Sequence, residues 1–191
     1  MSSEGLMRAL IILVVAFAIG SNWQSWADDA CSGLAIEAEA NVQVSDGNSF
    51  QVATAFHSKR HASFRQINDD SSTLIVAEGP GSWVRNAGED FVGTDFHKLF
   101  ALGHQFHAFL LHFNHIAENV RLSEAIEFQG ENRAALSGDY PYGGSVHLIK
   151  SANPQKPVGL LFEFPDIPPI TVVFADWRWL EGALMPFQLF I

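Results

Sequence analysis

Four histidines are the residues of this chain most able to do chemistry. His104, His107, His112 and His115 fall at positions i, i+3, i+8 and i+11, so on one helix they share an arc of about 140°. Imidazoles one turn apart can bind zinc or copper. No His-Glu-x-x-His pattern or locally spaced third ligand accompanies them. We therefore expect a polar helix face that uses histidine and no bound metal, with a metal site at these four as the alternative.

Other catalytic patterns are missing from the sequence. No Gly-x-Ser-x-Gly motif occurs, the single cysteine is Cys31, and Gly79 to Gly81 precede no helix that could bind phosphate. Nothing in the spacing pairs any two of the candidate acids, which are Glu78, Asp95, Asp139, Asp166 and Asp176. We expect no enzymatic activity and no cofactor.

The histidines would lie on one amphipathic helix from Asp95 to Glu118. At 100° per residue its other face is apolar, formed by Leu99, Leu102, Phe106, Phe109, Leu110 and Phe113. Such a wide apolar face is typical of a helix that lies flat on a sheet. Gly103 is expected to bend the helix or divide it in two.

The rest of the chain has the pattern of antiparallel strands separated by turns. Alternation from Leu34 to Val44 predicts a strand, although alanine and glutamate also favour a helix there. The other predicted strands are residues 50–56, 61–67, 73–78, 82–85, 91–93, 125–128, 145–150, 158–164, 170–177 and 184–191. Residues 158–162 and 170–174 are apolar on both faces, so they must be covered twice or line a space.

Aromatic residues are abundant, with 16 Phe and 5 Trp. A curved sheet under a Phe-faced helix could hold an acyl chain in an apolar, water-free cavity, although each aromatic residue could also belong to an ordinary core. The predicted cavity residues are Phe64, Trp83, Phe91, Phe106, Phe109, Phe113, Phe162, Phe164, Phe174 and Trp177.

The N-terminus has the pattern of a secretory signal peptide. Arg8 precedes the apolar run from Ala9 to Ile19, and Ser25-Trp26-Ala27 fits a cleavage site. We predict a signal peptide over residues 1–27, a single domain over residues 28–191, and a periplasmic location. The net charge of −10 and the lack of a basic cluster argue against nucleic acid as a partner.

Residues 61–85 resemble the first strands of the LolA/LolB periplasmic lipoprotein carriers, in which His-Ala-Ser-Phe-x-Gln precedes Glu-Gly-x-Gly and a Trp-Val strand. The matching residues are His61, Ala62, Ser63, Phe64, Gln66, Glu78, Gly79, Gly81, Trp83 and Val84. The resemblance implies an incomplete β-barrel closed by helices around a lipid cavity. The Arg-Pro stretch of the carriers is replaced here by Arg85-Asn86-Ala87, so their arginine-controlled lid mechanism does not carry over.

The sequence and the resemblance together predict an α+β fold, with a strongly curved antiparallel sheet (an incomplete β-barrel) covered by one or two amphipathic helices. The expected function is a non-enzymatic carrier of lipid acyl chains, from a lipoprotein or glycolipid. Its expected partners are lipid or lipid-modified protein cargo and a membrane-associated acceptor. The alternatives are a metal-binding protein with a histidine-rich helix and a structural or adaptor β-domain with a filled core.

Overall fold

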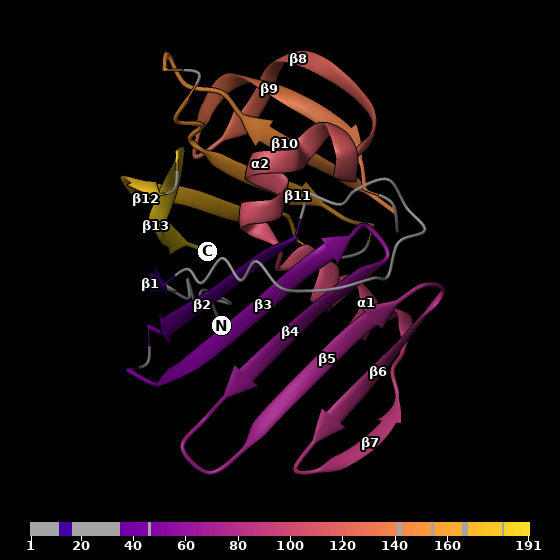
Figure 1. The fold of residues 1–191 in the computed structure, drawn as a ribbon. Helices are drawn as coiled ribbons and strands as arrows, with labels where there is room; N and C mark the ends of the chain where they lie inside the picture. The colour runs from indigo at the N-terminus through magenta and orange to yellow at the C-terminus, as the bar shows by residue number, and fades with distance from the viewer. Residues whose placement is uncertain are drawn as a thin grey trace, which may run out of the picture.

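A computed structural model describes residues 12–16, 35–45, 47–140, 143–153, 155–165, 168–180 and 182–191 of the 191-residue chain. Within these residues, thirteen strands form one sheet and two helices pack against it (Figure 1). The first seven strands are β1 (Ile12–Ala16), β2 (Ile36–Gln43), β3 (Ser49–Ser58), β4 (His61–Ile67), β5 (Ser72–Glu78), β6 (Gly81–Asn86) and β7 (Glu89–Val92). The helices α1 (Asp95–Gly103) and α2 (Phe106–Ile116) follow. The last six strands are β8 (Glu118–Phe128), β9 (Glu131–Asp139), β10 (Ser145–Ile149), β11 (Gly159–Glu163), β12 (Ile170–Leu180) and β13 (Ala183–Phe190).

The two helices connect one edge strand of the sheet to the other. The order is β7-β6-β5-β4-β3-β2-β1-β13-β12-β11-β10-β9-β8, and every neighbouring pair runs antiparallel. The chain leaves the sheet at one edge, β7, passes through α1 and α2, and enters it again at the other edge, β8. The described strands therefore do not close into a barrel.

Short turns build the first half as a meander of hairpins. Gly79, with a φ of 54°, and Pro80 join β5 to β6, and the pairing of Glu78 with Gly81 closes this two-residue turn. Ala87 and Gly88 both have positive φ and join β6 to β7 in the same way. Positive φ at the turn matches the right-handed twist of the strands, which favours tight hairpins.

The core lies between the helices and one face of the sheet. Alternation in β2 buries Ala38, Ala40 and Val42 on that face, as the sequence predicts. Phe109 of α2 packs edge-to-face on Phe162 of β11, with 5.3 Å between ring centroids. A smaller cluster of Phe128, Ala135, Ile149 and Leu161 forms apart from this core and includes β11, which explains why that strand is apolar on both faces.

Most predicted elements are confirmed, and the helix from Asp95 is divided at Gly103. Three elements differ from the prediction: β1 and β9 were not predicted as strands, and β8 begins at Glu118 and not at Ala125. The strand β1 pairs with β2 and β13 and lies within residues 1–27, the predicted signal peptide. The proposed cleavage site and Cys31 lie outside the described residues. No helix among the described residues is long and apolar enough to cross a membrane.

Candidate functional site

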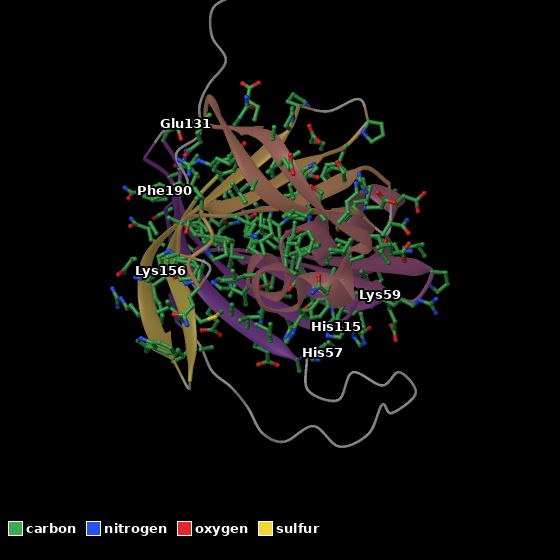
Figure 2. All side chains as sticks on the ribbon, turned by 90° about the horizontal axis from the view of Figure 1, so that it is seen from above. His57, Lys59, His115, Glu131, Lys156 and Phe190 are labelled. Carbon is green, nitrogen blue, oxygen red and sulfur yellow. The ribbon has the colours of Figure 1, made fainter. Side chains whose placement is uncertain are left out.

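An apolar cavity of about 260 Å³ lies between strands β2 to β4 and the two helices. Its lining consists of Ala38, Ala40, Val42, Phe50, Val52, Thr54, Phe64, Gln66, Phe100, His104, Phe106, His107 and Ile191. Nine of these thirteen residues are apolar, so the cavity favours an apolar occupant over water. In the view of Figure 2 side chains crowd the centre of the molecule, where the helices pack between the strands.

The strand side of the cavity follows from alternation and register. Ala40 of β2 lies opposite Val52 of β3, which in turn lies opposite Gln66 of β4. These three residues therefore share one face of the sheet. Alanine at positions 38 and 40 leaves space where a larger side chain would fill the gap to the helices.

The helix side of the cavity comes from the break between α1 and α2. The end of α1 contributes Phe100, the break contributes His104, and the first turn of α2 contributes Phe106 and His107. Gln105 holds this break against the sheet, because its side-chain amide donates to the Ser63 carbonyl at 2.9 Å and to the Ala101 carbonyl at 2.8 Å. Gln105 is 3% exposed, and its role has no signal in the sequence pattern.

Three phenylalanine rings surround the imidazole of His104. Its ring centroid lies 4.0 Å from that of Phe100, 4.9 Å from that of Phe64 and 5.6 Å from that of Phe106. Its Nδ1 donates to the Phe100 carbonyl oxygen at 2.8 Å. Burial lowers the pKa of His104, and this hydrogen bond offsets part of that effect. The imidazole is therefore neutral at neutral pH.

His107 is buried more deeply, at 5% exposure. Its Nε2 lies 3.2 Å from the carbonyl oxygen of Pro186 in β13 and donates to it. Burial lowers the pKa of His107 to about 4, although the hydrogen bond to Pro186 favours the charged form. Both cavity histidines are thus uncharged in a neutral solution.

The expectation of one polar histidine face is wrong for His104 and His107, which line the cavity. The break at residues 103–105 shifts the phase of α2 relative to α1, and non-helical backbone at His112 (φ −128°, ψ 31°) disturbs it again. His115 is exposed and lies near the edge of the molecule in Figure 2. Among the described residues, no group of three or more His, Cys, Asp or Glu side chains could hold a metal ion.

The predicted cavity aromatics occupy three different environments. Phe64 and Phe106 line the cavity. The core buries Phe109, Phe113, Phe162 and Phe174, and Phe164 and Trp177 pack against it partly buried. Trp83 lies on the face of β6 opposite buried Val84, with the Arg85 guanidinium 5.6 Å from its ring centroid. Phe91 on the edge strand β7 is 47% exposed.

The sequence pattern did not reveal a polar cluster on β9, β10 and β11, formed by Ser137, His147 and Glu163. His147 of β10 is 4% exposed, with Nδ1 2.7 Å from the Ser137 hydroxyl oxygen and Nε2 2.8 Å from a carboxylate oxygen of Glu163. A Ser-His-Glu set can in principle perform nucleophilic catalysis. Ser137 is only 1% exposed, however, so a substrate cannot reach its hydroxyl. The arrangement satisfies buried polar groups and stabilises the sheet.

Comparison with known proteins supports the fold alone. No protein-family model matches the sequence, and no curated protein matches it. Among solved structures, a LolA superfamily protein from Nitrosomonas europaea is similar, with a TM-score of 0.52 and 10% sequence identity. The match covers 95% of this chain and 76% of the other. The chain therefore has a LolA-like fold of antiparallel strands and two helices.

Proposed function

We propose that this protein is a periplasmic carrier that holds the acyl chain of a lipid in the cavity between β2 to β4 and the helices, without covalent chemistry. The observation that carries the proposal is the cavity itself. It has an apolar lining, it lies between two helices and a sheet, and its histidine side chains are uncharged. Such a space lowers the free energy of an acyl chain by removing it from water.

The arrangement of the sheet supports the expected incomplete barrel. The helix α2 contacts β2, β8 and β10, which lie far apart in the strand order. A sheet that reaches one helix from such distant strands must bend around it. The LolA-like fold of the neighbour agrees with this shape. This likeness and the cavity together support a carrier function.

The location and the partners extend the proposal. The predicted signal peptide over residues 1–27 would export the chain to the periplasm, where lipid or lipid-modified protein would be its cargo. A carrier must also release its cargo, so we include a membrane-associated acceptor in the proposal. The cavity distinguishes this function from a domain with a filled core, and the inward position of His104 and His107 disfavours a histidine-rich metal face.

A cavity-filling substitution tests the proposal. Ala40→Leu adds three carbons on the cavity face of β2, whereas Asn41→Leu places the same side chain on the opposite, exposed face of that strand. If the larger side chain at position 40 displaces about three methylene groups of a bound chain, at about 0.8 kcal/mol each, affinity for a fluorescent fatty-acid probe falls on the order of fiftyfold.

The Asn41→Leu protein is expected to bind the probe as the wild type does. Circular dichroism of both variants checks that the fold is retained. If Ala40→Leu and Asn41→Leu bind the probe equally well, the acyl chain does not occupy this cavity and the proposal is wrong.

A further inference from the structure

A backbone carbonyl determines which ring nitrogen of His104 can accept a hydrogen bond. The Phe100 carbonyl oxygen lies 2.8 Å from His104 Nδ1, and a carbonyl oxygen only accepts hydrogen bonds. Nδ1 must therefore carry hydrogen in the neutral ring, which leaves Nε2 with a lone pair and no hydrogen. His104 lines the cavity, so Nε2 is the candidate acceptor for a bound molecule.

The surroundings of His104 keep it an acceptor. The rings of Phe64, Phe100 and Phe106 pack around the imidazole, and the described lining of the cavity includes no aspartate or glutamate. The other titratable side chain in that lining is His107, which is itself uncharged in a neutral solution. A neutral imidazole in an apolar space cannot pair with a carboxylate, but it can accept a hydrogen bond from a neutral donor.

The remaining polar side chains of the lining serve the protein itself or lie beside His104. Gln66 donates its amide to Asn68 at 3.2 Å, and His107 donates to Pro186. Thr54 lies opposite Phe64 in the register of β3 and β4, so its hydroxyl is on the same stretch of the sheet that His104 covers. Thr54 and His104 therefore supply polar groups to the same part of the cavity lining.

We propose that the ligand is a single-chain amphiphile with a neutral hydroxyl group, such as a long-chain alcohol or a hydroxylated acyl chain, and that this hydroxyl donates to His104 Nε2. This inference rests on the proposed carrier function and names its ligand class. An apolar chain without a donor would bury the Nε2 lone pair unsatisfied, which is unfavourable in a dry site. A carboxylate would place its own lone pairs against that of Nε2.

The size of the cavity supports a single chain. At about 260 Å³ it is just below the roughly 300 Å³ at which sites for drug-sized ligands begin. A ligand with several acyl chains would need more space than this cavity offers, so only one chain of a larger cargo would fit. The ligand class is thus narrower than the cargo of a general lipid carrier.

A pair of probes of equal chain length tests the inference. Decanol carries the hydroxyl donor, and decyl methyl ether keeps the oxygen but lacks the donor. Displacement of a fluorescent acyl probe from the full-length protein would measure both affinities. We expect decanol to bind about tenfold more tightly than the ether, the effect of one neutral hydrogen bond to a buried acceptor.

Two variants locate the preference at one atom. His104→Leu removes the acceptor and should lower the ratio of the two affinities to about one, whereas His104→Gln can place its amide oxygen near the Nε2 position and should keep a ratio of about threefold. A ratio near one in the wild type overturns the ligand class, and so does a tenfold ratio that persists in His104→Leu. If the wild type binds neither decanol nor the ether, both the ligand class and the proposed carrier function are wrong.

Discussion

The buried His107 makes the stability of the protein depend on pH between 7 and 4. Burial holds the pKa of His107 at about 4 in the folded protein, against an ordinary value of 6.5 in the unfolded chain. Between these values the unfolded chain binds more protons at this site than the folded protein does. The free energy of unfolding therefore falls as the pH falls from 6.5 towards 4, and the stabilising contribution is fully present above pH 6.5.

The size of the effect follows from the two pKa values. A shift of one unit corresponds to about 1.4 kcal/mol, so the move from 6.5 to about 4 predicts a loss of about 3 kcal/mol. His104 adds to the loss in the same direction, because burial lowers its pKa as well. Among the described lining residues, no aspartate or glutamate lies beside these two rings to compensate their charge.

Urea unfolding at pH 7, 5.5 and 4 would measure this loss. His107→Gln keeps a side-chain N–H for Pro186 and removes the titration, so its stability should fall by about 3 kcal/mol less than that of the wild type over the same range. His115→Gln, a change at an exposed histidine of the same helix, serves as the matched control and should follow the wild type. Equal pH dependence in His107→Gln and the wild type would refute the reasoning.

Three further predictions concern stability and activity. Gly138→Ala would bring a Cβ within 2.7 Å of the Ala117 Cβ and should destabilise the protein by about 1–3 kcal/mol, measured by urea unfolding. Gly130→Ala meets no atom within 4 Å and should cost only the strain of its positive φ, about 1 kcal/mol, which should be less than the loss in Gly138→Ala. Equal losses at both positions would contradict the close approach at Gly138. His147→Leu leaves the buried Ser137 hydroxyl without its partner and should cost about 1–3 kcal/mol. In an ester-hydrolysis assay, the wild type and Ser137→Ala should give the same rate. A rate that is lost in Ser137→Ala would show that substrate reaches the Ser137 hydroxyl.

The sequence predicted the elements whose patterns are local. Alternation located β2 although its alanines and glutamates favour a helix, because burial of one face outweighs intrinsic propensity. It failed for β8 and β9. In β8 the pairing shifts between Ser123 and Ile126, and Leu122 is 59% exposed, so no alternating apolar face forms. The strand β9 relies on Ala135 and Gly138, small residues that fit close contacts and carry little strand signal.

The sequence predicted the kind of site, an apolar cavity, but only some of the residues that line it. The sequence pointed to an apolar cavity between the helix and the sheet, and Phe64 and Phe106 do line it. It did not find Ala40 or His104. A buried alanine has the same local pattern whether it touches a neighbour or borders a space. The position of His104 depends on the phase shift at the helix break, which Gln105 fixes through a contact with Ser63, distant in sequence.

Native mass spectrometry of the protein, purified gently from the periplasm of an expressing bacterium, tests the central claim most directly. We predict that the protein carries a bound lipid with one acyl chain, and that the Ala40→Leu protein carries markedly less of it than the Asn41→Leu protein. Spectra of the wild type that show only the mass of the chain, together with no binding of an added fatty-acid or alcohol probe, would contradict the account.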